Sequence, residues 1–181
     1  GKTVPVIESV ASEITKIKDS IKQTISHQQT GFLAATRQPS EPFSLSPPLE
    51  NLCAQFERSG RRVETRIAPD VRVVGHREPI LQGVENMIKN AVEATVPGGI
   101  ITVTCEPAPD GATVVVEDDG AGVAEADLQR VMTAGFTTKP DGHGLGLHSF
   151  AVLLSASNGR LTIESPGPGK GARVKAEIRN A

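Results

Sequence analysis

The sequence predicts an α+β fold, in which helices cover one face of a mixed β-sheet and a long separate helix precedes them. Residues 6–30 contain neither Gly nor Pro and carry a helical stripe of apolar residues. The rest of the chain mixes β-branched runs, turn residues and helical stretches without a regular alternation of strand and helix. A purely parallel sheet is therefore not expected.

The apolar stripe of the first helix is narrow. Val10, Ile14, Ile17 and Ile21 follow at intervals of four, three and four residues, which is the spacing of a helix–helix seam. A narrow stripe on a long helix is typical of a two-helix or four-helix stalk outside a globular core. A helix that packs on its own domain is the alternative.

A hinge and a second domain are expected after this helix. Residues 31–48 contain several prolines and predict a linker. Ser46 followed by Pro47 predicts a helix start, with the Ser side chain as the cap and Pro in the first turn. We therefore place a partial stalk and hinge at residues 1–38 and a second domain at residues 46–181.

The second domain is expected to contain helices and strands in a mixed order. In chain order these are a helix at 46–59, strands at 63–67 and 71–74, a helix at 78–95, strands at 100–105 and 113–117, a short helix at 125–131, a helix at 145–157, and strands at 161–164 and 172–178. The turn residues at 109–111 predict a hairpin, and 166–171 is a Gly/Pro turn between the last two strands.

Composition excludes several classes of function. The net charge is −2 and aromatic residues make up 3% of the chain, all of them Phe, so neither a general polyanion surface nor base-stacking platforms are expected. A nucleic-acid partner is therefore not predicted. Cys53 and Cys105 belong to no CxxC pair or His-rich cluster, which favours core thiols over a zinc site.

No membrane segment or signal peptide is predicted in this chain. No apolar run approaches the length of a membrane-spanning helix, and the first residues lack the charged and apolar regions of a signal peptide. A cytoplasmic location follows as an expectation, while a membrane anchor in a longer protein stays open.

The first motif of chemical interest lies on the helix predicted at 78–95. Asn86 and Asn90 are four residues apart, so both amides project from one face. An amide oxygen is a neutral hard ligand that suits Mg²⁺ with waters and phosphate oxygens. Such a pair is also common in solvated or capping positions.

The second motif follows a strand. Asp118 can accept a hydrogen bond from an exocyclic amine such as that of adenine, and Gly120 and Gly122 allow close approach of the backbone to a ring. A polar turn without ligand is the alternative.

Two further motifs surround the start of the helix predicted at 145–157. Residues 135–139 read Gly-Phe-Thr-Thr-Lys, and residues 142–147 read Gly-His-Gly-Leu-Gly-Leu. Glycines at a helix start expose N–H groups that can cradle phosphate. The spacing fits neither a Walker loop nor a dinucleotide-binding fingerprint.

The four motifs, in this order, resemble those of the GHKL ATPase superfamily and, within it, the histidine kinases. The resemblance covers residues 46–178 and implies a Bergerat-type α/β sandwich, with ATP held under a mobile lid at 123–141. Residues 14–32 resemble the second stalk helix of one kinase subgroup. By this likeness the chain is the ATP-binding core of a two-component sensor histidine kinase, with ATP and Mg²⁺ as cofactors.

The resemblance also implies roles for individual residues. Asn90 is the expected Mg²⁺ ligand, Asn86 assists at the phosphates, and Asp118 reads the adenine amine. The complete expected ATP-binding set is Asn86, Asn90, Asp118, Gly120, Gly122, Phe136, Thr137, Thr138, Lys139, Gly142, His143, Gly144, Leu145, Gly146 and Leu147.

A kinase is favoured over an ATP-hydrolysing member of the superfamily. Gyrase-like and MutL-like members carry a water-activating Glu four residues before the metal-binding Asn, where this chain has Asn86. Glu85 is one place away, about 100° around the helix, and points elsewhere. Without a positioned base, water attack is expected to be slow.

The phosphorylated histidine is not expected among the four histidines of the chain. His27 lies on the stalk helix, but it is followed by Gln and is only 63 residues before Asn90 (90 − 27 = 63). His76 and His148 are expected to be structural. The acceptor is therefore expected upstream of Gly1, and this chain alone is not expected to phosphorylate itself.

The resemblance implies a homodimer through the stalk and a response-regulator receiver domain as partners. A GHKL protein-serine kinase and a non-catalytic nucleotide-binding module are the alternatives. The sensed signal, the sensor domain, the cognate regulator and any phosphatase activity leave no trace in the sequence.

Overall fold

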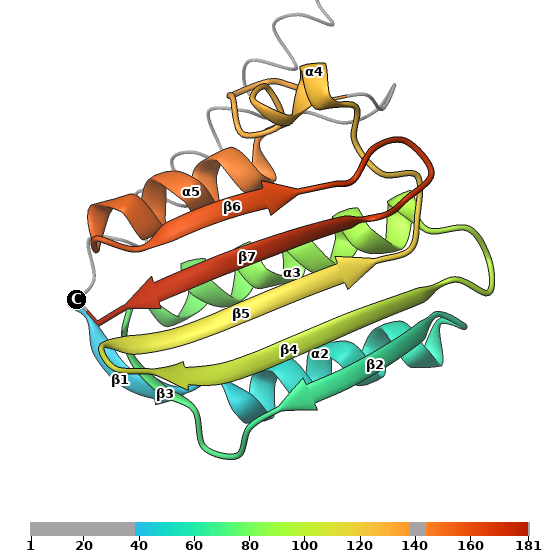
Figure 1. Cartoon of the computed structure of the whole chain (residues 1–181). Helices are drawn as coiled ribbons and strands as arrows, with labels where there is room; N and C mark the ends of the chain where they lie inside the picture. The colour runs from blue at the N-terminus through green and yellow to red at the C-terminus, as the bar shows by residue number, and fades with distance from the viewer. Residues whose placement is uncertain (1–38, 138–143, 181) are drawn as a thin grey trace, which may run out of the picture. The chain divides into compact units, whose positions relative to one another are not determined.

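The computed structural model describes residues 39–137 and 144–180, all within one compact unit, Ala35–Ala181 (Figure 1). The helix predicted at 6–30 lies outside the described residues, so the stalk stays a prediction. The division at residues 38 and 46 stays one too.

The described elements follow the predicted order, except that the first of them, a short strand, was not predicted. They are β1 (Glu41–Ser44), α2 (Ser46–Arg58), β2 (Arg62–Ile67), β3 (Arg72–Gly75), α3 (Arg77–Ala94), β4 (Ile100–Ala108), β5 (Gly111–Asp118), α4 (Glu125–Leu128), α5 (Gly146–Ala156), β6 (Arg160–Glu164) and β7 (Ala172–Arg179). The predicted boundaries lie within a few residues of these, because Gly and Pro punctuation marks the ends of most elements.

The larger sheet is mixed, as predicted. Its strand order is β2-β4-β5-β7-β6, in which β2 pairs with β4 in parallel and the other neighbours are antiparallel. β4 and β5 form the predicted hairpin. α2, α3 and α5 lie on one face of this sheet (Figure 1). The α+β fold with helices on one face is therefore confirmed.

The core lies between this sheet and its helices. Val114 and Val116 of β5 are buried on the helix-facing side, and Val84, Met87 and Ile88 of α3 are fully buried against it. On the opposite face, β7 carries exposed polar side chains, such as Arg173 with its ion pair to Glu117 at 2.9 Å. The helix side of the sheet is thus apolar, while the other side is mainly polar, as expected for helices on a single face.

Helices α3 and α5 approach each other closely at one glycine. A Cβ added at Gly83 would lie 2.1 Å from the Phe150 ring, and Phe150 is itself buried. The missing side chain therefore allows the ring to rest directly on the α3 backbone. This contact fixes the spacing of two helices that carry predicted site residues.

The prediction of a linker at residues 31–48 was wrong over its last part. Residues Glu41–Ser44 form β1, which pairs antiparallel with β3. Pro42 fits there because β1 is an edge strand, where a residue without an N–H is tolerated. Glu41 pairs with Gly75, so the partner strand is distant in sequence. The prolines near β1 therefore indicated a linker and not this pairing.

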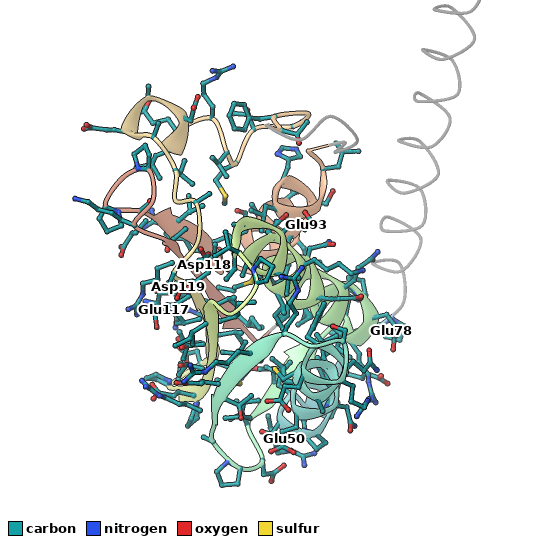
Figure 2. The ribbon with its side chains drawn as sticks, turned by 90° about the vertical axis from the view of Figure 1, so that its right-hand side faces the viewer. Glu50, Glu78, Glu93, Glu117, Asp118 and Asp119 are labelled. Carbon is teal, nitrogen blue, oxygen red and sulfur yellow. The ribbon has the colours of Figure 1, made fainter. Side chains whose placement is uncertain are left out.

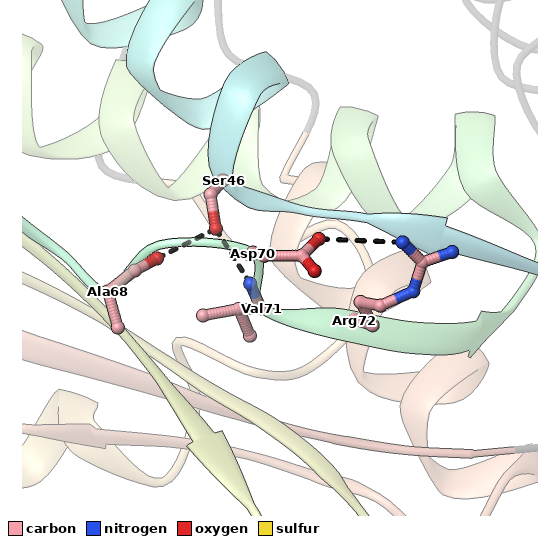
Figure 3. Close-up of polar contacts among 5 residues, drawn as sticks. All are labelled: Ser46, Ala68, Asp70, Val71 and Arg72. Carbon is pink, nitrogen blue, oxygen red and sulfur yellow. Dashed lines mark hydrogen bonds and ion pairs between the residues drawn. The ribbon is translucent and has the colours of Figure 1, made fainter.

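The prediction that Ser46 caps α2 was also wrong. The capping position is Leu45, no side chain caps the helix, and Ser46 is 3% exposed. Its hydroxyl donates to the Ala68 carbonyl at 2.8 Å and accepts the Val71 N–H at 2.9 Å (Figure 3). Ser46 therefore ties the start of α2 to the turn between β2 and β3.

Replacing Ser46 with Ala is expected to lower the free energy of unfolding by about 2 kcal/mol, because it leaves a buried N–H and a carbonyl without partners. Urea denaturation followed by circular dichroism measures the change. Ser59→Ala is the matched control, since its hydroxyl bonds the Phe56 carbonyl on the exposed surface. Equal effects for the two variants would contradict the assigned role.

Candidate nucleotide-binding site

The first and fourth motifs meet at the middle of α3. A Cβ added at Gly146, the first residue of α5, would lie 3.1 Å from the Asn86 side chain. Asn86 and Asn90 occupy successive turns of the same helix face. The start of α5 therefore lies directly beside the asparagine row.

The second motif rests on the far end of α3. The Ala121 N–H donates to the Ala94 carbonyl at 2.9 Å, and a Cβ at Gly120 would lie 2.3 Å from the same carbonyl. Figure 2 shows Asp118 and Asp119 where β5 ends, near Glu93 of α3. Three of the four motifs thus converge along α3.

The Asp118 carboxylate is held by a backbone group of its own loop. Its Oδ1 accepts the Gly120 N–H at 2.9 Å. Burial raises the pKa of Asp118 above its usual value; hydrogen bonding from the backbone at Gly120 and Ala172 works against that rise, and the neighbouring Asp119 charge adds to it. A partly desolvated carboxylate with fixed orientation suits recognition of a donor such as an amine.

Sequence reasoning missed the role of Asp119. Its Oδ1 accepts the Ile100 N–H at 2.9 Å, and its own N–H donates to the Ile100 carbonyl at 3.3 Å. Asp119 therefore joins the end of β5 to the start of β4. Its position beside Asp118 was visible in the sequence, but its partner was not.

The Gly/Pro turn at 166–171 was predicted as a connection only, yet it packs on the second motif. The Gly169 N–H donates to the Ala121 carbonyl at 2.6 Å, and the Gly171 N–H donates to the Gly120 carbonyl at 3.0 Å. A Cβ at Gly122 would lie 2.2 Å from the Gly167 carbonyl oxygen. Glycine richness on both sides was the available signal, because close backbone contact requires it.

The third motif is described only in part. The Gly135 N–H donates to the Gly144 carbonyl at 3.1 Å, so the third motif contacts the Gly-rich fourth motif. His148 Nδ1 contacts the Met132 carbonyl at 3.1 Å, which connects α5 to the segment before the third motif. The Arg130 guanidinium stacks 4.8 Å from the Phe136 ring centroid.

Some predicted site residues contribute differently from others. Leu145 and Leu147 are buried, so their side chains belong to the core and only their backbone can face a ligand. Asn90 and Thr137 both make interactions in the structure. Thr138, Lys139, Gly142 and His143 lie outside the described residues.

Among the described residues, no group of three or more His, Cys, Asp or Glu side chains could hold a metal ion. Across those same residues, no helix is both long enough and apolar enough to cross a membrane.

Cys53 and Cys105 are free and buried, and burial raises the pKa of each thiol to about 11.

Residues 75–181 match the family described as histidine kinase-, DNA gyrase B- and HSP90-like ATPase. Among curated proteins, the C4-dicarboxylate transport sensor protein DctB of Rhizobium meliloti is 35% identical over 178 residues, covering 93% of this chain and 28% of that protein. Sensor protein DegM of a Bacillus strain is 33% identical over 102 residues, covering 56% and 27%. The chain thus spans little more than a quarter of these relatives.

Solved structures agree with this assignment. The catalytic domain of histidine kinase ThkA superposes with a TM-score of 0.71 at 26% identity, covering 79% of this chain and 97% of that one. The full-length kinase ShkA in complex with AMPPNP superposes with a TM-score of 0.69 at 21% identity, covering 94% and 39%, and supports the fold. The chain therefore belongs to the histidine kinase-, DNA gyrase B- and HSP90-like ATPase family, and it is similar to the catalytic domains of sensor histidine kinases.

Proposed function

We propose that this domain binds Mg·ATP and transfers the γ-phosphate to a histidine outside the chain. The observation that carries the proposal is the convergence of three motifs on α3. Asn86 packs beside the glycine that begins α5, and the Asp118 loop docks on the Ala94 carbonyl two turns further along. A nucleotide has the same layout, with a base at one end and phosphates at the other.

The base end of the site is assigned to Asp118. Its carboxylate accepts a hydrogen bond from the exocyclic amine of adenine. Gly120 and Gly122, which have no side chains, line the adenine ring. Because the Gly120 N–H holds Oδ1 of the carboxylate, its free lone pairs have a defined direction. A base that presents a carbonyl in place of the amine is thereby disfavoured.

The phosphate end is assigned to the start of α5. Gly144 and Gly146 leave the first N–H groups of the helix open, and no side chain caps them. Asn86 assists there. We assign the remaining contacts to the lid, through Phe136, Thr137, Thr138, Lys139, Gly142 and His143, with the backbone of Leu145 and Leu147 at the helix start.

The oxygen donors at the phosphate end fit Mg²⁺, bound by the protein and the nucleotide phosphates together. Mg²⁺ is usually held by one or two protein oxygens together with substrate phosphates and water, so a site without a carboxylate cluster is suitable. We assign Asn90 as its protein ligand, through the amide oxygen. When bound, the ion neutralises phosphate charge during transfer.

The absence of a water-activating base at position 86 favours phosphotransfer over hydrolysis. Glu85, the neighbouring acid, forms an ion pair with Lys89 at 2.7 Å along the surface of α3. It is thereby oriented along the helix and not toward the asparagine face. The γ-phosphate is then preserved for the acceptor histidine.

The test is phosphotransfer in trans. The chain is incubated with Mg·[γ-³²P]ATP and the acceptor-histidine stalk of the same kinase, and both free phosphate and labelled protein are measured. We expect slow hydrolysis and a protein label that is stable to base and labile to acid, as phosphohistidine is. An acid-stable label would identify a serine kinase, and nucleotide binding without transfer would identify a non-catalytic module.

For the whole protein we propose a homodimer through the stalk helix at residues 6–30 and a response-regulator receiver domain as the next phosphate acceptor. The catalytic domain is assigned to the cytoplasm, where ATP is available. These proposals rest on the likeness of the domain to sensor kinases and on the helix–helix seam in the sequence.

A further inference from the structure

His148 is the third residue of α5, and its ring is half-buried. Its Nδ1 lies 3.1 Å from the carbonyl oxygen of Met132, which stands 16 residues earlier in the chain. A carbonyl oxygen only accepts hydrogen bonds, so Nδ1 must carry the proton and donate it. His148 therefore joins the first turn of α5 to the segment that leads into the third motif.

That segment, residues 130–136, is held together by its own contacts. The Thr133 N–H donates to the Arg130 carbonyl at 2.8 Å, and the Phe136 N–H donates to the Thr133 carbonyl at 3.2 Å. The Arg130 guanidinium also stacks on the Phe136 ring. A bond to Met132 therefore constrains the position of the whole segment and not of one residue alone.

Two contacts join residues 130–136 to the phosphate end of the candidate site. One is the backbone bond from the Gly135 N–H to the Gly144 carbonyl, which ends on a residue that precedes α5. The other is the His148 bond, which ends inside the helix, where the backbone is regular. A segment held by one bond can pivot about it, whereas two separated bonds fix its direction. The His148 side chain supplies the second of them.

α5 is itself fixed to the helix that carries the asparagine row. The buried Phe150 ring rests on Gly83 of α3, and the Asn86 side chain lies beside Gly146. His148 lies between these two contacts in the sequence of α5. The position of the third motif relative to the asparagine row therefore depends on the hydrogen bond of this imidazole.

We propose that His148 is a positioning residue of the nucleotide site, which holds the third motif at the phosphate end through its hydrogen bond to Met132. Phe136 and Thr137 are then presented from a segment that is already in place, and binding does not have to order it first. The inference rests on the proposed function, because the third motif must contact the phosphates for its position to matter.

The first test needs no nucleotide. Long-range ¹H–¹⁵N NMR of the wild-type chain reports which ring nitrogen of His148 carries the proton in the neutral imidazole. We expect the proton on Nδ1, because the hydrogen bond that a ring nitrogen makes sets the tautomer. A neutral ring protonated on Nε2 would overturn the proposal, since Nδ1 could then not donate to the Met132 carbonyl.

The second test measures how much of the affinity for the phosphates depends on His148. Wild type, His148→Ala and His148→Asn are titrated in the presence of Mg²⁺, calorimetrically with a non-hydrolysable ATP analogue and by the NMR shift of the Gly120 amide with AMP. For His148→Ala we expect about tenfold weaker binding of the ATP analogue, as for one lost hydrogen bond, and AMP binding within about twofold of wild type. The Asn amide supplies an N–H donor close to the place of Nδ1, so His148→Asn is expected to restore most of the affinity.

Ser155→Ala is the matched control on the same helix. Its hydroxyl donates to the Ala151 carbonyl at 2.8 Å on the exposed side of α5, so neither affinity is expected to change. Equal weakening of both ligands in His148→Ala, or no weakening of either, would overturn the positioning role while the proposed function stands. A wild type that does not bind the ATP analogue would instead contradict the proposed function itself.

Discussion

Replacing Asp118 with Ala is expected to weaken binding of a Mg·ATP analogue by about a hundredfold or more. The substitution removes a charge-assisted hydrogen bond to the base amine, worth about 1.5–3 kcal/mol. It also leaves the Gly120 N–H, now bonded to Asp118 Oδ1 at 2.9 Å, without its partner beside the ring. Isothermal titration calorimetry with and without Mg²⁺ measures the loss.

Asp110→Ala is the control for this variant. Asp110 lies at the opposite end of β5, and its side chain makes an exposed ion pair with Arg179 at 3.4 Å. We expect an affinity within about twofold of wild type, since an exposed pair contributes little. An Asp118→Ala variant that binds as tightly as this control would show that the base lies elsewhere.

The conservative variant Asp118→Asn separates binding from stability. Burial raises the pKa of Asp118 in the folded state, so the ionised carboxylate opposes folding above that pKa. The amide that replaces it carries no charge, and the variant is expected to melt at a higher temperature than wild type at pH 7 while binding ATP poorly. The difference should shrink as pH falls from the raised pKa through the unfolded value of 3.8, where both states of the wild type become protonated.

Replacing Gly83 with Ala is expected to lower the free energy of unfolding by about 2–3 kcal/mol. Helix propensity alone predicts the opposite sign, since Ala is favoured over Gly by about 1 kcal/mol in a helix interior. The added Cβ would meet the Phe150 ring at 2.1 Å, and both residues are buried, so the overlap outweighs propensity. Chemical denaturation at equilibrium measures the net effect.

The neighbouring Gln82→Ala isolates propensity, because Gln82 is exposed on the same helix. We expect a change within about 0.5 kcal/mol for this control. Adding Phe150→Leu to Gly83→Ala is expected to recover part of the loss, as contacting residues couple. A Gly83→Ala protein more stable than wild type would mean that α3 and α5 can move apart freely.

Elements with strong local signals were predictable from the sequence. The α3 stripe with Val84, Met87 and Ile88 indicated the helix and its buried face, and the Pro-Asp-Gly turn indicated the β4–β5 hairpin. Each of these signals is contained within a few neighbouring residues. The order of the four motifs likewise needed only the chain itself.

Features that depend on distant partners were not predictable. β1 exists because it pairs with β3, and Ser46 bonds groups some 22–25 residues away. The Ser165 hydroxyl accepts the Val123 N–H across 42 residues, a contact that nothing near Ser165 in the sequence indicated. Polar residues that serve as long-range connectors look, in sequence, like ordinary caps and turns.

Both ends of the candidate site lie on α3. The rise of the helix between them therefore sets the distance that a ligand must span. From Asn86 to Ala94 the helix rises by about 12 Å, at about 1.5 Å per residue. A helix is stiff, so the regular backbone of α3 fixes this separation. The size of molecule that can engage both ends at once is therefore set by two turns of regular backbone.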